Sequence, residues 1–208
     1  MTAADRPAGE NRTMYTLHGT VKSRAMRPLW LLEELGVEYA FVSTAPRSPE
    51  ALALSPSGKI PVLVTLEGTI LDSVAMMTWL ADRHGAFTHP AASFRRAQQD
   101  ALTHTILETF DAVLWAYAKH SFVLPEERRV PDVKESLRWQ FGEHARAMDR
   151  LLGERTFLTG EAPVVPDILL AHCCGWAAGL GLALPGGLER HMQGMRARPA
   201  FSRALTRG

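Results

Sequence analysis

Ser23 is the first residue whose type and position suggest chemistry. It lies between a strand candidate over residues 14–18 and an amphipathic helix expected over residues 26–35. The start of a helix presents unpaired N–H groups and a partial positive charge, which favour a bound anion such as a thiolate. A serine hydroxyl there could donate a hydrogen bond to a thiolate supplied by the substrate. Serine is equally suited to capping the helix, so its position alone leaves both roles open.

The segment SPSGKIPVL, residues 55–63, suggests a second contact with a ligand. Pro61 begins a strand candidate, and a cis peptide bond between Ile60 and Pro61 would turn the backbone N–H and C=O of Ile60 toward a ligand that docks like an extra strand. Lys59 could then meet a carboxylate. Considered alone, the segment is more simply explained as a tight turn that leads into an edge strand.

Asp72 and Ser73 form the third candidate, at the start of a helix that Gly85 should end. A carboxylate beside a hydroxyl and unpaired helix N–H groups could bind the ammonium and the carboxylate of an amino acid together. An ordinary helix cap again explains the pair if no other observation is considered.

The elements that position these residues follow the order β-α-β-α-β-β-α. Hydrophobic periodicity and turn residues predict strands over residues 14–18, 39–43, 61–66 and 69–71, and helices over residues 26–35, 49–54 and 73–84. This is the order of a thioredoxin-like domain, in which the three candidate loops meet at one edge of the sheet. The three signals therefore support one another.

Beyond His89 and Pro90 the strand patterns give way to helical periods, which predicts an all-α helical bundle. We expect a thioredoxin-like ligand-binding domain over residues 13–88, a helical domain over residues 94–208 and a disordered tail over residues 1–12. The segment 168–178 is apolar nearly all round, which is typical of a central helix in a bundle. Other helical periods cover residues 102–117, 137–152 and 188–195.

The composition excludes several classes of protein. The 208 residues include 23 Lys and Arg against 22 Asp and Glu, so no net charge favours nucleic acid or an anionic membrane. The cysteines, Cys173 and Cys174, are adjacent, and the histidines form no close ligand pair, so we expect no metal site and no disulfide. With no secretory signal and no stretch of 18 apolar residues, a soluble cytoplasmic protein is expected.

Five segments in the same order resemble the bacterial cytosolic glutathione transferases. They are LHGTVKSRAMRPLWLLEELGVEY, SPSGKIPVL, LDSVAMMTWLADRHG, FLTGEAPVVPDILLAHCCGWA and RARPAF. The resemblance implies that Ser23 stabilises the thiolate of glutathione, the co-substrate, and that Ile60, beside Pro61, binds its cysteinyl unit. It also implies that Asp72 and Ser73 bind the γ-glutamyl end, and that Lys59 lies near the glycyl carboxylate.

The resemblance further implies a homodimer and an electrophile pocket in the helical domain. Trp115, Tyr117 and His120 are candidates for that pocket, although such a stripe is as often part of a core. Three positions depart from the family pattern. Asp72 replaces a longer Glu, Pro28 falls early in the first helix, and Val164 stands where a Ser or Thr would complete a capping box with Asp167.

The leading hypothesis is an enzyme that adds the glutathione thiolate to an electrophilic small molecule, in a detoxification role. The alternative is a glutathione-binding protein of the same fold with weak or no catalysis. A glutaredoxin-like oxidoreductase is disfavoured because the helix start carries Ser23 and no cysteine. Isomerase, dehalogenase and peroxidase variants, the identity of the electrophile, and the choice between Ser23 and Thr20 as thiolate donor stay open.

Overall fold

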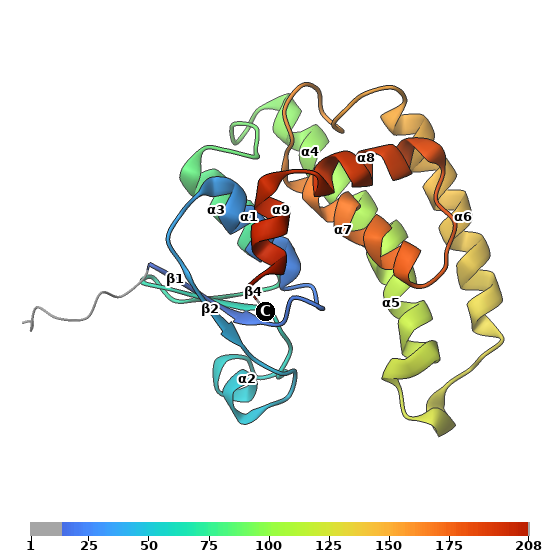
Figure 1. Ribbon diagram of the computed structural model, residues 1–208, viewed down its shortest axis with the longest axis horizontal. Helices are drawn as coiled ribbons and strands as arrows, with labels where there is room; N and C mark the ends of the chain where they lie inside the picture. Colours follow the sequence, from blue (N-terminus) through green and yellow to red (C-terminus); the bar gives the residue numbers. More distant parts are fainter. Residues whose placement is uncertain (1–13, 208) are drawn as a thin grey trace, which may run out of the picture.

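A computed structural model describes residues 14–207, which begin with a four-stranded mixed sheet (Figure 1). The strands run in the order β2-β1-β3-β4, where β1 is parallel to β2 and antiparallel to β3, and β3 is antiparallel to β4. Helices α1 and α3 lie over one face of the sheet and α2 lies on the other side. The elements are β1 (Tyr15–Gly19), α1 (Met26–Leu35), β2 (Ala40–Ser43), α2 (Pro49–Leu54), β3 (Val62–Thr65), β4 (Thr69–Leu71) and α3 (Ser73–His84).

The local sequence explains how β1 leads into α1. Tyr15 and Leu17 alternate with more exposed neighbours and are fully buried, as expected for a strand covered by helices. Pro28 occupies the first turn of α1, where a backbone N–H would have no partner within the helix, so the helix is not broken. Gly36 ends α1 with φ of 64°, a left-handed conformation that glycine adopts without strain.

The second part of the chain is helical, and its first helix is long and interrupted by π-helical turns. It runs through α4 (Phe94–Ile106), a π turn at Leu107–Asp111, α5 (Ala112–Ala118) and a second π turn at Lys119–Val123. A 3-10 turn at Glu126–Arg128 leads to α6 (Val133–Leu152), which is followed by α7 (Val165–Gly179), α8 (Gly186–Arg196) and α9 (Pro199–Leu205).

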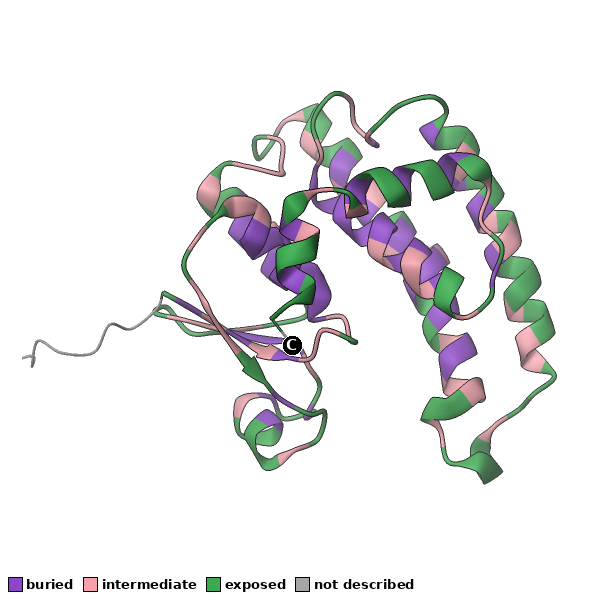
Figure 2. Ribbon diagram, viewed as in Figure 1, coloured by how far each residue is buried: buried purple, intermediate pink, exposed green. Residues whose placement is uncertain are grey.

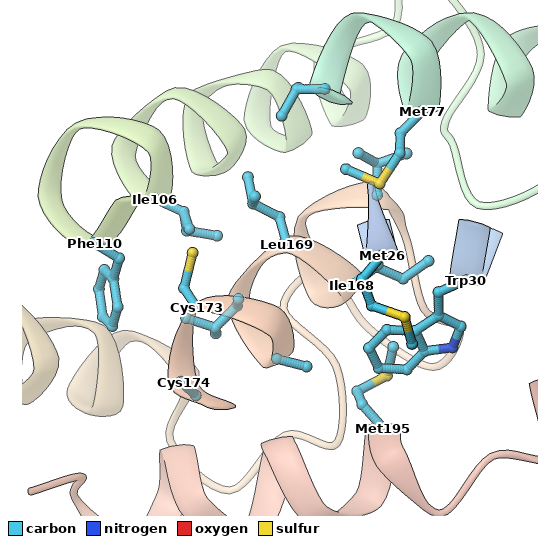
Figure 3. Close-up of a cluster of buried hydrophobic side chains, with 14 of the residues drawn as sticks. Met26, Trp30, Met77, Ile106, Phe110, Ile168, Leu169, Cys173, Cys174 and Met195 are labelled. Carbon is cyan, nitrogen blue, oxygen red and sulfur yellow. The ribbon is translucent and has the colours of Figure 1, made fainter. Parts of the chain in front are cut away.

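Helix α7 is central to the helical part, as its sequence predicts. It lies between the α4–α5 helix and α8, and most of it is buried (Figures 1 and 2). Figure 3 shows Ile168 of α7 beside Trp30 of α1 and Met195 of α8, so one apolar core joins the two parts of the chain. Cys173 and Cys174 are unpaired and packed in this core, and burial raises the pKa of Cys173 to about 12.

The start of α7 has one of the two hydrogen bonds of a capping box, as expected from Val164 in place of Ser or Thr. Asp167 accepts hydrogen bonds from the backbone N–H of Val164 and of Leu158, each at 2.8 Å. A valine side chain has no acceptor, so the reciprocal bond cannot form, and the N–H of Asp167 donates instead to the carbonyl of Val164 at 2.9 Å.

Helix α9 was not predicted, and part of it appeared in the sequence analysis only as the segment RARPAF. It packs back against α1, where the rings of Trp30 and Phe201 have centroids 4.7 Å apart. Arg203 bonds to the carboxylate of Glu33 at 2.7 Å, and Arg198 bonds to that of Glu34 at 2.6 Å. The last helix of the chain therefore completes the outer surface of the first domain.

The predicted order of strands and helices is confirmed, and each predicted strand lies within one residue of its observed bounds. The tail expected at residues 1–12 lies outside the described residues. None of the described helices is long and apolar enough to cross a membrane.

Candidate functional site

The turn that contains Ser23 joins β1 to α1 at the boundary between the two parts of the chain. The hydroxyl of Ser23 donates a hydrogen bond to the carbonyl of Thr20 at 2.7 Å and accepts one from the N–H of Ala25 at 3.1 Å. Its only proton is therefore engaged within the turn. To donate to a bound anion, the hydroxyl must rotate and give up the bond to Thr20.

The loop before β3 lies directly against this turn. A side chain at Gly19 would overlap Ala25 and touch the Cα of Pro61, so the end of β1, the start of α1 and Pro61 are in close contact. The peptide bond between Ile60 and Pro61 is cis, as the sequence suggested. The backbone N–H and C=O of Ile60 have no hydrogen-bond partner within residues 14–207. They are available to a ligand that docks as an extended chain.

Asp72 and Ser73 begin α3, and both side chains have partners within the protein. Oδ1 of Asp72 accepts hydrogen bonds from the N–H of Val74 and Ala75 at 2.9 and 3.0 Å, which makes it a helix cap. Its side chain is exposed, and its backbone φ of 75° is unusual for a residue other than glycine. Ser73 is buried, and its hydroxyl accepts a hydrogen bond from Arg27 at 3.4 Å. Asp72 thus has one oxygen left for a ligand.

Lys59 lies in the loop before β3, where it is exposed and has no salt-bridge partner among the described side chains. Its ammonium group is therefore available to a carboxylate, and its role at the glycyl end of glutathione stays a prediction.

A buried ionic cluster, formed by Arg24, Arg27 and Asp111, lies behind the Ser23 turn. Arg24 binds the carboxylate of Asp111 through Nε and Nη2 at 2.5 to 2.9 Å, and Arg27, which is fully buried, binds it at 3.2 Å. Burial alone would raise the pKa of Asp111, but the hydrogen bonds and charges of the two arginines together hold it below its ordinary value. Asp111 ends the first π turn, so the irregular helix supplies the anion that joins both parts of the chain.

His172 of α7 extends this cluster. Its Nδ1 accepts a hydrogen bond from Nε of Arg27 at 3.2 Å, which requires a neutral ring. Burial, followed by the positive charge of Arg27, lowers the pKa of His172 well below its ordinary value. The imidazole is therefore uncharged at neutral pH and contributes no charge to the surroundings of Ser23.

An open cavity of about 290 Å³ lies between the two parts of the chain, and we call it the interdomain cavity. Ser23 and His172 line it, together with three cations, Lys22, Arg24 and Arg196. Its apolar walls are formed by Val21, Met26, Trp30, Trp115, Trp176, Phe201 and Leu205. The cavity thus joins a hydroxyl, an aromatic wall and positive charge.

Of the three residues predicted for an electrophile pocket, Trp115 lines this cavity and the other two lie elsewhere. The hydroxyl of Tyr117 accepts a hydrogen bond from Arg138 of α6 at 3.1 Å, and its ring lies below the ammonium of Lys134. Nδ1 of His120 accepts from the N–H of Val130 at 3.1 Å. Successive residues of a helix point in different directions, so Tyr117 faces α6 while Trp115 faces α7.

Sequence reasoning missed the ionic cluster and Arg196. One signal was present, because His172 falls on a predicted helical segment that is otherwise apolar, and such a polar residue needs a partner when buried. Nothing in the sequence pairs Arg27 with Asp111, which lies 84 positions after it. Among residues 14–207 no group of three or more potential ligands could hold a metal ion.

Comparison with known proteins places this geometry in context. Residues 23–83 match the family described as glutathione S-transferase, N-terminal domain. A theta class glutathione S-transferase of Xanthomonas axonopodis pv. citri, solved with glutathione bound, superposes with a TM-score of 0.78 at 25% identity, covering 93% of this chain and 97% of that one. The described chain has the glutathione transferase fold.

Two curated proteins share part of the sequence. Elongation factor 1-gamma of Trypanosoma cruzi is 30% identical over 124 residues, which cover 59% of this chain and 29% of that protein. Glutathione S-transferase 3 of Schizosaccharomyces pombe is 31% identical over 116 residues, covering 54% of this chain and 43% of that protein. The matched region is thus less than half of the length of either relative.

Proposed function

We propose that this protein is a glutathione transferase, which activates the thiol of glutathione as a thiolate and adds it to an electrophilic small molecule. The observation that carries the proposal is the position of Ser23, which lines the interdomain cavity and lies in the turn that contacts Pro61. A thiol held there would meet a hydroxyl donor at the start of α1, and the apolar walls of the cavity would receive the electrophile.

The remaining groups of glutathione have plausible partners on the same edge of the sheet. The unpaired backbone N–H and C=O of Ile60 suit the cysteinyl unit of an extended tripeptide. The second carboxylate oxygen of Asp72 suits the ammonium of the γ-glutamyl end, and the exposed Lys59 suits the glycyl carboxylate. The hydroxyl of Ser73 accepts a bond from Arg27 and keeps its own proton, which suits the carboxylate of the γ-glutamyl end.

The alternative function is a glutathione-binding module with weak catalysis. Two observations favour it. The proton of the Ser23 hydroxyl is engaged with Thr20 at 2.7 Å, and one of the partial relatives is an elongation factor subunit. Isomerase, dehalogenase and peroxidase variants would use the same activated thiol and remain within the leading proposal.

Two measurements on the purified protein distinguish these functions. Retention on immobilised glutathione tests binding, and the conjugation of 1-chloro-2,4-dinitrobenzene tests transfer. Retention with turnover supports the transferase, whereas retention without turnover on a panel of electrophiles supports the binding module. A protein that is not retained by glutathione and does not bind it in calorimetry would contradict both.

We also propose a homodimer that acts in the cytoplasm, in a detoxification role. Phe94 and Leu66 are large apolar side chains that expose 79% and 68% of their surface, and a second copy would cover them. The unpaired Cys173 and Cys174 suit a reducing compartment. Light scattering should give twice the chain mass, and Phe94→Glu should shift that mass toward one chain. A single-chain mass for the wild-type protein at micromolar concentration would contradict the dimer.

A further inference from the structure

The interdomain cavity has an unusual charge for a site with aromatic walls. Lys22, Arg24 and Arg196 line it, and none of the described residues that line it is acidic. The nearest carboxylate in the ionic cluster, Asp111, is already shared between Arg24 and Arg27. A ligand in the cavity therefore meets an excess of positive charge.

Arg24 is held so that one end of its guanidinium stays available. Nε and Nη2 bind Asp111, whereas Nη1 has no hydrogen-bond partner within the described chain. The guanidinium lies over the rings of Trp115 and Trp176, at 5.0 and 5.2 Å from their centroids. Asp111 and the two tryptophans fix the orientation of Arg24, so a ligand would lose little of its binding free energy in ordering this side chain.

Arg196, at the end of α8, has no hydrogen-bond or salt-bridge partner in residues 14–207, and its Nε is buried without an acceptor. Its guanidinium lies over Phe201, 5.3 Å from the ring centroid, and covers the backbone of Gly175. Any side chain at position 175 would overlap the guanidinium, so Gly175 provides the space that lets Arg196 reach the cavity. Because Nε is enclosed by protein atoms, a ligand in the cavity would meet the terminal Nη groups of Arg196, which also have no partner in residues 14–207.

Three other arginines near the end of the chain have carboxylate partners, whereas Arg196 has none in residues 14–207. Arg198 pairs with Glu34, and Arg203 and Arg207 pair with Glu33. Arg196 is two residues from Arg198, yet it lines the cavity and has no carboxylate partner in residues 14–207. The Nη groups of Arg196 are therefore available to bind an anion in the cavity.

We propose that the interdomain cavity accepts an electrophile with one aromatic ring and a carboxylate, which Arg196 and Nη1 of Arg24 bind together. This inference rests on the proposed transferase function and specifies its substrate class. The volume of about 290 Å³ is at the lower end of the range of roughly 300 to 1,000 Å³ that is usual for ligand sites, which suits a single ring. Arginine binds a carboxylate through two parallel hydrogen bonds and stacks on aromatic rings, so both features of the ligand have a partner.

A suitable probe reaction is the conjugation of 4-(chloromethyl)benzoate. The thiolate sulfur of glutathione attacks the benzylic carbon, the C–S bond forms, the C–Cl bond breaks, and chloride leaves with the bonding electron pair. The carboxylate takes no part in the bond changes, so its effect on the rate reports recognition by the cavity. The matched neutral substrate is 4-methylbenzyl chloride.

The first experiment compares two product analogues, S-(4-carboxybenzyl)glutathione and S-benzylglutathione, by calorimetry. We expect the carboxylate to tighten binding by roughly 10- to 100-fold, the factor for one or two charge-assisted hydrogen bonds. Arg196→Met should remove most of this preference, and Arg196→Lys should keep part of it. Arg190→Met removes a charge from an exposed position of the same helix and should leave the preference unchanged. Unfolding curves confirm that each variant is folded.

Equal affinity of the two analogues for the wild-type protein would overturn the inference. So would an Arg196→Met variant that weakens both analogues equally, because Arg196 would then bind a carboxylate of glutathione itself. The ratio of turnover numbers for 4-(chloromethyl)benzoate and 4-methylbenzyl chloride should follow the same pattern across the variants.

A second experiment keeps this inference separate from the proposed function. Without glutathione, 4-ethylbenzoate should quench the fluorescence of the cavity tryptophans, whereas 4-ethylbenzyl alcohol should do so far more weakly. If the glutathione analogues do not bind but 4-ethylbenzoate does, in a manner that depends on Arg196, the transferase proposal fails and the anion site stands. If 4-ethylbenzoate does not bind either, both are overturned.

Discussion

Replacing Ser23 by alanine tests whether the hydroxyl activates a thiol or only shapes the turn. In the structure the hydroxyl donates its single proton to the carbonyl of Thr20 at 2.7 Å. When glutathione binds, the Ser23 hydroxyl must exchange this hydrogen bond to a neutral carbonyl for one to the charged thiolate. The net gain is the difference between the two hydrogen bonds.

The magnitude follows from typical values. A hydrogen bond to a charged group contributes roughly 1.5 to 3 kcal/mol and a neutral one about 0.5 to 1.5 kcal/mol, so the exchange gains about 1 to 1.5 kcal/mol. At about 1.36 kcal/mol per unit, Ser23→Ala should raise the pKa of the bound thiol by about one unit. Conjugation below that pKa should fall about tenfold, while the affinity for glutathione should change little.

The assay is a pH titration of the thiolate absorbance of bound glutathione, together with conjugation rates for both proteins. Raising the pH should restore most of the lost rate, because the thiolate then forms without the hydroxyl. Thr20→Val is the matched control, since it removes the neighbouring hydroxyl but keeps the backbone carbonyl. If Ser23→Ala leaves the thiol pKa and the rate unchanged, the role of Ser23 is structural, and a shift in Thr20→Val would assign activation to Thr20.

Three further predictions concern the surrounding residues. Asp72→Ala should weaken glutathione binding in calorimetry and lower the free energy of unfolding by about 0.5 to 2 kcal/mol, because the helix cap is lost. Asp72→Asn should keep the cap and weaken only the binding of glutathione. Equal affinities of the wild-type protein and both variants would show that Asp72 only caps α3. Asp111→Asn should destabilise the fold by about 3 to 5 kcal/mol in denaturant unfolding, because it leaves the buried Arg27 unpaired, and a loss below 1 kcal/mol would count against the cluster. The lowered pKa of His172 means that below about pH 6.5 the unfolded chain takes up a proton that the folded chain does not, so stability should fall as the pH falls from 7 to 5. His172→Asn should flatten that slope, and an unchanged slope would contradict the assignment.

The first domain was predictable because its signals are local. The strand and helix periods of residues 14–85, the glycines that end α1 and α3, and the proline before β3 each act within a few positions of the chain. The cis peptide bond between Ile60 and Pro61 was also suggested by a local signal, and the structure contains it. Local patterns also gave the central position of α7, since a segment that is apolar on all sides has to be covered on all sides.

The functional surroundings of Ser23 were less predictable because they depend on contacts between distant segments. The partner of Arg27 comes from a π turn in a helix that begins in another domain, and helical periodicity does not indicate a π turn. Arg196 could not be told from Arg198 in the sequence either. In the structure Arg196 packs against Gly175 and has no carboxylate partner among the described residues, whereas Arg198 pairs with Glu34. The roles proposed for Lys59, Ile60, Asp72 and Ser73 stay predictions until glutathione binding is measured.

The contact between α9 and α1 has a consequence for how the chain is made. Trp30 is fully buried, and part of its cover is Phe201 of α9, which the ribosome adds about 170 residues later. At roughly 5 to 20 residues per second, α1 waits on the order of 10 to 30 s for this cover. During that time the nascent first domain exposes an apolar face, and the carboxylates of Glu33 and Glu34 lack their arginine partners. A nascent chain stalled before residue 199 should therefore be a substrate for chaperones and proteases, even though all of its strands have already been synthesised.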